Sequence, residues 1–187
     1  MSSSAVLRQV NLLKIIRMQT QQGNSPLRVV VQQVNNNTTA WMGQRTGDNE
    51  KIVAGQTFTC PAEGDLDTIE IFSSLVVKAG HANMTLHAFD PSTKEWGPVL
   101  HTSSVVINKN DGEKWISFPQ TGLHLNKGNT YGFQLQSDDM YIGIGEAAGS
   151  RLQPPYIGGQ EWTSSNGKEP EKYYSYLSLA FKVGLRA

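Results

Sequence analysis

The chain has 187 residues, 38% of them hydrophobic, and its 16 basic and 16 acidic side chains balance to a net charge of zero. This length suits one domain with a substantial core and a spare terminal segment. A neutral chain is not typical of a nucleic-acid-binding protein, and no stretch approaches the roughly 18 apolar residues that a membrane-spanning helix needs. We therefore expect no nucleic-acid partner and no membrane span.

Residues 1–24 form an N-terminal amphipathic segment ahead of a domain over 25–187. Apolar side chains recur there at helical spacing, and Gly23-Asn24 followed by Pro26 would end a helix (Val6, Val10, Leu13, Ile16). The pattern predicts a short helix or arm, with a strand as the alternative because Leu7 and Ile15 fall off the stripe. Its expected role is to dock on the domain or to mediate homo-oligomerisation through residues 5–22.

From residue 27 onward, short alternating apolar runs are separated by Gly, Pro, Asn and Asp, a pattern typical of half-buried antiparallel strands. Runs of this kind occupy residues 27–34, 55–59, 66–72, 83–89, 99–107, 115–118, 130–135, 141–144 and 176–183. Two intervening stretches are predicted to be loops: the polar residues 35–49, which carry Trp41, and residues 146–173. The fold class is therefore all-β, a two-sheet antiparallel sandwich of jelly-roll or Greek-key type.

The inward positions of these runs predict a single core shared by both halves of the chain, and they include Phe58, Ile71, Leu86, Phe133 and Phe181. The lone cysteine, Cys60, lies within this pattern, so we expect a buried and inert thiol.

Several motifs occur in an order that resembles a known bacterial module: Gly55-Gln56-Thr57-Phe58, Trp115-Ile116-Ser117-Phe118, Tyr156-Ile157-Gly158-Gly159 and Leu179-Ala180-Phe181-Lys182-Val183. The module is a jelly-roll-like β-sandwich of surface and secreted proteins that is often described as carbohydrate-binding-like. The resemblance covers roughly residues 50–184 and implies an extracellular or cell-surface location. The chain departs from it in having Ser178 where many members have Asp, and in its N-terminus, where Lys14 and Arg17 make a poor secretory signal.

Four aromatic residues in predicted loops are the candidate carbohydrate-binding residues. Tyr156, Trp162 and Tyr173 lie in the 146–173 stretch among polar side chains, and Trp96 lies beside Gly97-Pro98. Sugars bind to proteins by stacking on aromatic faces, with a few polar groups that fix their orientation. The alternative is that these rings cap the ends of the core.

No catalytic signature is present, so we expect no enzymatic activity and no cofactor. No single strand carries the paired carboxylates of a glycosidase, and the four histidines (His81, His87, His101 and His124) show no metal-binding spacing. A structural calcium ion held by Asp65, Asp67, Asp138 and Asp139 stays an alternative without an EF-type loop to support it.

Two functional hypotheses follow. The first is a non-catalytic module that binds carbohydrate through its loop aromatics. The second is a structural or assembly protein whose N-terminal segment drives oligomerisation.

Overall fold

The computed structural model describes residues 25–45, 47, 50–165 and 169–186. The predicted N-terminal segment, 1–24, lies outside the described residues. Within them the chain forms thirteen strands and no helix, and hence no helix that could cross a membrane. The strands are β1 (Leu27–Gln33), β2 (Thr38–Gln44), β3 (Lys51–Thr59), β4 (Gly64–Lys78), β5 (Gly80–Asp90), β6 (Glu95–Ile107), β7 (Lys114–Leu125), β8 (Thr130–Gln136), β9 (Tyr141–Ala148), β10 (Glu161–Ser165), β11 (Glu169–Tyr174), β12 (Leu177–Leu179) and β13 (Phe181–Arg186).

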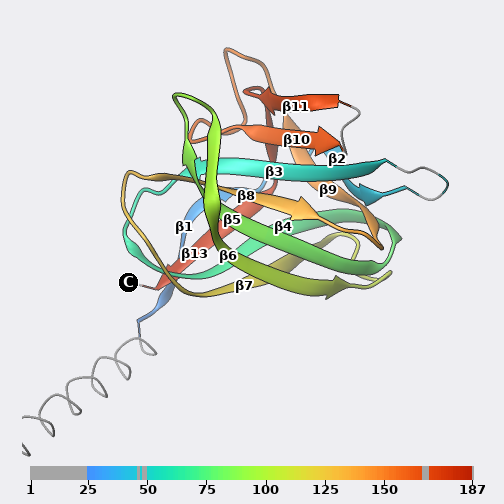
Figure 1. Cartoon of the computed structure of the whole chain (residues 1–187), viewed down its shortest axis with the longest axis horizontal. Helices are drawn as coiled ribbons and strands as arrows, with labels where there is room; N and C mark the ends of the chain where they lie inside the picture. Colours follow the sequence, from blue (N-terminus) through green and yellow to red (C-terminus); the bar gives the residue numbers. More distant parts are fainter. Residues whose placement is uncertain (1–24, 46, 48–49, 166–168, 187) are drawn as a thin grey trace, which may run out of the picture.

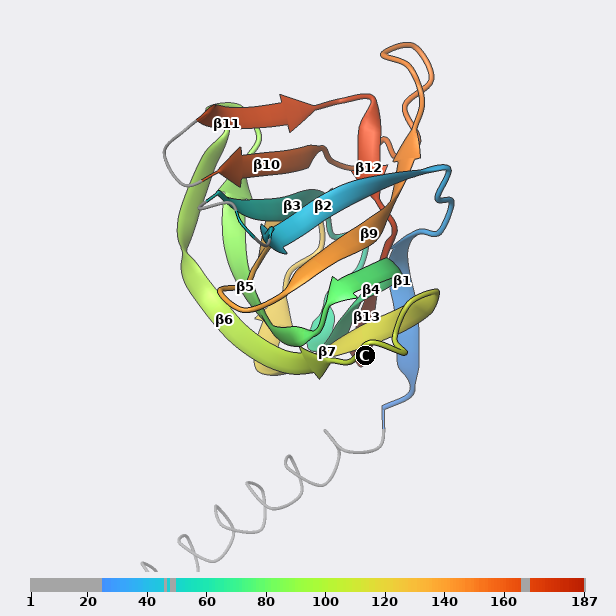
Figure 2. The same cartoon turned by 90° about the vertical axis from the view of Figure 1, so that its right-hand side faces the viewer.

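All of these strands belong to one antiparallel sheet that is strongly curled (Figures 1 and 2). Its main order is β1-β13-β4-β9-β2-β3-β8-β5-β6. β7 pairs with the other edge of β4, β12 pairs with β9, and the β10–β11 hairpin joins the sheet through β3. Figure 2 shows β5 and β6 bending around the molecule toward β7.

The long strand β4 carries the sheet around its bend. Its first half pairs with β13 and β7, and its second half, from Ser73 onward, pairs with β9. The register slips near residues 66–68, 73–75 and 76–78. Bulges of this kind increase strand twist and bend the strand locally, so one strand serves both halves of the sheet.

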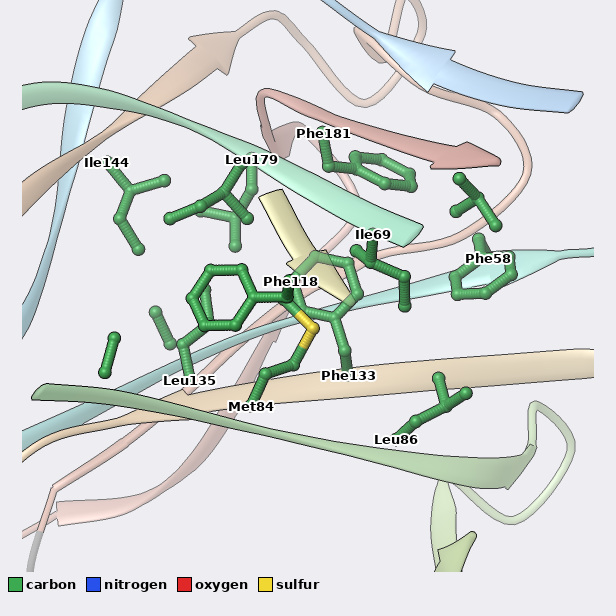
Figure 3. Packing of buried hydrophobic residues seen from close by; sticks show 14 of the residues in the cluster. Phe58, Ile69, Met84, Leu86, Phe118, Phe133, Leu135, Ile144, Leu179 and Phe181 are labelled. Carbon is green, nitrogen blue, oxygen red and sulfur yellow. The ribbon is translucent and has the colours of Figure 1, made fainter. Parts of the chain in front are cut away.

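The core lies between the two halves of the curled sheet. Figure 3 shows side chains of β5 and β8, such as Met84 and Phe133, meeting Ile69 of β4 and Phe118 of β7. The Phe181 ring on β13 lies 6.2 Å from the Phe58 ring and 5.7 Å from the Phe133 ring, between centroids. All five predicted core residues are fully buried: Phe58, Ile71, Leu86, Phe133 and Phe181. The predicted single core, shared by both halves of the chain, is confirmed.

The all-β antiparallel class is also confirmed, but the two separate sheets of a jelly roll are not observed, since β4 and its partners connect everything into one sheet. The predicted loop over 35–49 contains β2, and the predicted irregular stretch 146–173 contains the β10–β11 hairpin. Cys60 is buried, and burial raises the pKa of its thiol, as expected of an inert cysteine.

Candidate functional site

Three of the four predicted site residues meet on the outer face of the curled sheet. Trp96 comes from β6, Trp162 from β10 and Tyr173 from β11. The Trp96 and Trp162 rings are 5.2 Å apart between centroids and pack edge to face. Trp162 and Tyr173 are register partners in the β10–β11 hairpin. Both views place the β5–β6 turn beside this hairpin (Figures 1 and 2).

Two glycines make room for the tryptophans on the sheet surface. A Cβ atom at Gly132 of β8 would lie 2.6 Å from Trp96 Cζ3, and one at Gly55 of β3 would lie 2.9 Å from Trp162 Cε3. Both separations are too short for real contacts. Because neighbouring residues such as Phe133 face the core, these glycines face outward, and they let the rings lie directly on the backbone.

Hydrogen bonds hold the cluster in one arrangement. Trp96 Nε1 donates to the Tyr173 hydroxyl at 2.9 Å, and that hydroxyl donates to the Lys94 carbonyl, also at 2.9 Å. His87 packs edge to face on Trp96. One His87 ring nitrogen contacts the Gly97 carbonyl oxygen at 2.9 Å and therefore donates to it. These bonds fix the β5–β6 turn against β11.

An open pocket of about 700 Å³ lies beside this cluster. Its walls combine aromatic and charged side chains, among them Phe89, Asp90, Lys94, Glu95, Trp96 and Glu171. We call this the Trp96 pocket. A smaller hollow of about 280 Å³ adjoins it, since both share Phe89 and Lys94, and it adds hydroxyl groups from Thr57, Thr59 and Thr130. Apolar faces with a few polar groups are typical of small-ligand sites.

Two of the predicted residues have other roles. Tyr156 packs edge to face on Phe181 of the core at 5.4 Å between centroids, away from the cluster, and burial raises the pKa of its phenol to about 12. Trp162 belongs to the cluster but is only 3% exposed. Its Nε1 donates to Glu171 Oε2 at 3.3 Å. Tyr156 is therefore a capping residue of the core, and Trp162 supports the pocket wall from behind.

Sequence reasoning missed several residues of the pocket. The Phe89 ring lies 5.2 Å from the Trp96 ring between centroids, although the sequence pattern of residues 83–89 indicates only a strand. Lys94 places its ammonium nitrogen 5.2 Å from the Tyr173 ring centroid. Lys94 also has a φ of +60°, an uncommon conformation for a residue other than glycine. Asp90-Pro91 is a typical turn sequence, but no sequence signal indicates that this turn would face β11.

Trp41, predicted to lie in a loop, forms a second outward-facing aromatic pair with Tyr141. Their rings stack at 5.0 Å between centroids and 9° between planes, and Trp41 is 37% exposed. Leu75 and Val77 of β4 are exposed as well. A Cβ atom at Gly143 would lie 2.5 Å from Thr39 Cγ2 and close to Trp41 and Leu75. The lack of a side chain at Gly143 therefore leaves room for these three side chains on the surface.

A pair of buried carboxyl groups lies behind the hairpin. Glu161 on β10 and Glu146 on β9 are 4% and 7% exposed and share a hydrogen bond. Burial raises the pKa of Glu161, and the neighbouring Glu146 charge raises it further, to about 9. Burial also raises the pKa of Glu146. The pair must therefore keep at least one proton at neutral pH.

The carboxylates considered for calcium are divided between two places. Asp65 contacts His124 and Asp67 contacts Arg186 at the start of β4, whereas Asp138 contacts Lys51 and Asp139 contacts His81 in the β8–β9 turn. Among the described residues, no group of three or more His, Cys, Asp or Glu side chains is arranged to hold a metal ion.

Comparison with known proteins gives similarity at the level of structure only. No family model and no curated protein matches the sequence. A structure of the clostridial cysteine protease Cwp84 after propeptide cleavage superposes with a TM-score of 0.51 at 8% identity, over 88% of this chain and 41% of that one. The cysteine protease and lectin-like domains of Cwp84, a surface-layer-associated protein of Clostridium difficile, match with a TM-score of 0.47 at 12% identity, over 75% of this chain and 33% of that one. The chain thus spans less than half of these neighbours and shares a fold with part of the first.

Proposed function

We propose that this domain is a non-catalytic binding module that holds a carbohydrate in the Trp96 pocket. The observation that carries the proposal is the convergence of Trp96, Trp162 and Tyr173 from three strands beside an open cavity of about 700 Å³. A half-buried indole ring with carboxylate, ammonium and hydroxyl groups around it matches the chemistry of a sugar, which presents one apolar face and a rim of hydroxyl groups. We propose an extracellular or cell-surface location for the module, as the resemblance of its sequence to a module of surface and secreted proteins implies.

The buried carboxyl pair is not placed for glycosidase chemistry in this pocket. Glycosidases need two carboxyl groups at least about 5 Å apart that flank the scissile bond. Glu146 and Glu161 are in hydrogen-bond contact and buried on the inner side of β10, and neither lines the Trp96 pocket. Asp90, which does line the pocket, accepts hydrogen bonds from the Ser92 amide and hydroxyl within its own turn.

A glycan array probed with the wild-type chain and with Trp96→Ala tests the proposal. We expect the substitution to weaken any hit about tenfold or more, which corresponds to about 1.4 kcal/mol. Because Trp96 packs on the outer face and not in the core, the variant should keep its fold, and circular dichroism checks this.

Trp115→Ala is the matched control, because Trp115 is another half-buried tryptophan that packs on a phenylalanine, Phe72, but lines no part of the pocket. Hits that survive Trp96→Ala contradict the proposal. If the same hits are lost with Trp41→Ala, the binding face is the Trp41–Tyr141 pair.

A specific observation also favours the second hypothesis, an assembly protein. β1 ends the strand order, and its Leu27 and Val29 are 47% and 51% exposed. An edge strand with exposed apolar side chains is a surface on which a second chain can pair.

A further inference from the structure

The Trp96 pocket carries an excess of negative charge. Three carboxylates line it, from Asp90, Glu95 and Glu171, against one ammonium group, that of Lys94. Within the described residues, each carboxylate uses a single oxygen for its hydrogen bonds: Asp90 Oδ1 in its own turn, Glu95 Oε2 with the Thr93 hydroxyl, and Glu171 Oε2 with Trp162 Nε1. Three carboxylates therefore line one aromatic cavity.

The surroundings of two of these carboxylates, Asp90 and Glu171, bear on the charge of the pocket. Hydrogen bonds from Ser92 hold the pKa of Asp90 below its usual value, so this group stays ionised. Burial raises the pKa of Tyr173, and the negative charge of Glu171 raises it further, so that charge lies close to the phenol ring. The next side chain on β11, Lys172, lines a different hollow on the other side of the hairpin and adds no positive charge here.

The aromatic rings, like the carboxylates, favour a positively charged ligand. Electron-rich ring faces attract cations, and the chain's own Lys94 ammonium already lies 5.2 Å from the Tyr173 centroid. The negative charge of the pocket would not attract a neutral sugar, and it would repel a uronic acid or a sialic acid. A sugar with a protonated amine would gain from both the carboxylates and the rings.

We propose, building on the carbohydrate-binding function above, that the Trp96 pocket selects saccharides that carry a protonated amino group, with Glu95 and Glu171 as the residues that determine this preference. The stacked sugar ring contacts Trp96, and its ammonium group lies among the carboxylates. The threonine-lined hollow beside the pocket accommodates the hydroxyl groups of a neighbouring sugar unit.

Calorimetric titration with two matched probes tests this proposal: fully deacetylated chitosan oligosaccharides and their fully N-acetylated counterparts, at mildly acidic pH where the amine is charged. We expect the deacetylated probe to bind about tenfold more tightly. The difference should shrink at 1 M salt, where the screening length falls to about 3 Å. Glu171→Gln keeps an oxygen for Trp162 Nε1 and removes the charge, so it should weaken binding of the deacetylated probe severalfold and binding of the acetylated probe much less.

Two further variants sharpen the result. Lys94→Met removes the resident cation and should strengthen binding of the deacetylated probe. Glu113→Gln removes an exposed carboxylate in the turn between β6 and β7, away from the residues that line the pocket, and should leave binding of both probes unchanged. Equal binding of both probes, or tighter binding of the acetylated one, would overturn the amine preference and leave the carbohydrate proposal standing. Absence of binding by any saccharide would reject both. A lysine-rich peptide that binds as tightly as the amino sugar would show that the pocket reads ammonium groups without the sugar.

Discussion

Glu161 and Trp162, adjacent residues of β10, face opposite sides of the sheet. Glu161 points inward to Glu146, and Trp162 points outward to Trp96. Successive side chains of a strand point to opposite faces of the sheet. The carboxyl pair and the candidate site are therefore connected by the single peptide bond between Glu161 and Trp162. Glu161 Oε2 accepts no hydrogen bond from the described residues, and its nearest charged neighbour is the like-charged Glu146. The local chemistry therefore favours a protonated Glu161.

This arrangement predicts a stability that falls as pH rises. In the folded chain the pKa of Glu161 is raised from its ordinary value of 4.5 to about 9. Below pH 4.5 both folded and unfolded states are protonated and no penalty exists. Between pH 4.5 and about 9 the unfolded state releases a proton that the folded state retains, so the free energy of unfolding declines.

Glu161→Gln should flatten this dependence, because the amide cannot ionise and still donates a hydrogen bond to Glu146. We expect a gain of at least about 1.4 kcal/mol at pH 8, the equivalent of one pKa unit, measured by urea unfolding between pH 5 and 9. An unchanged pH profile would show that Glu161 is ionised in the folded chain.

At the scale of elements, the β10–β11 hairpin and the β5–β6 turn meet through one hydroxyl group. The Tyr173 hydroxyl accepts a hydrogen bond from Trp96 and donates one to the Lys94 carbonyl, so it joins β11 to β6 and to the β5–β6 turn. Tyr173→Phe removes both bonds and keeps the ring. We expect a loss of about 1 kcal/mol in stability and a weaker pocket, because the turn that carries Asp90 and Lys94 loses its anchor. Thermal unfolding and ligand titration of the same sample measure the two effects.

Tyr176→Phe is the control for this prediction. The Tyr176 hydroxyl makes no hydrogen bond to the described residues, and its ring packs on an aromatic residue, Tyr174, as the Tyr173 ring packs on Phe89. Equal effects of the two substitutions would contradict the anchoring role of Tyr173.

The elements also explain which parts of the fold were predictable. Strands with one face on the core, such as β8 with Tyr131, Phe133 and Leu135, follow the alternation that their sequence shows. The Gly97-Pro98 pair predicts a loop around Trp96, but Trp96 lies in β6, which is an edge strand. Proline is tolerated there because no partner needs its missing N–H group.

Strands that lie in stretches predicted to be loops, such as β2, have few large buried apolar side chains, so their sequences lack the alternation typical of a strand. In β2 only Met42 contributes a large buried side chain, and the strand is defined by its pairing with β9. The convergence of Trp96, Trp162 and Tyr173 depends on long-range pairing of β10 with β3, about 107 residues apart in sequence, between Trp162 and Gly55. No local pattern encodes such a pairing, so the candidate residues were predictable one by one while their assembly, and the exclusion of Tyr156 from it, were not.

At the scale of the whole molecule, β1 places the start of the described chain at one end of the strand order, beside β13 and the C-terminal end. Residues 1–24, for which the sequence predicts an amphipathic segment, precede this strand in the chain. If the chain assembles through this segment and the β1 edge, deletion of residues 1–24 should convert an oligomer into single chains, as measured by size-exclusion chromatography with light scattering.

Val29→Lys in the full-length chain should weaken the same assembly, because a lysine on an exposed edge strand opposes pairing with another strand. Val106→Lys, on the edge strand β6 at the other end of the order and with a similarly exposed valine, should leave the oligomer intact. An identical mass for the full and truncated chains would remove the assembly hypothesis and leave the Trp96 pocket as the functional surface to be tested.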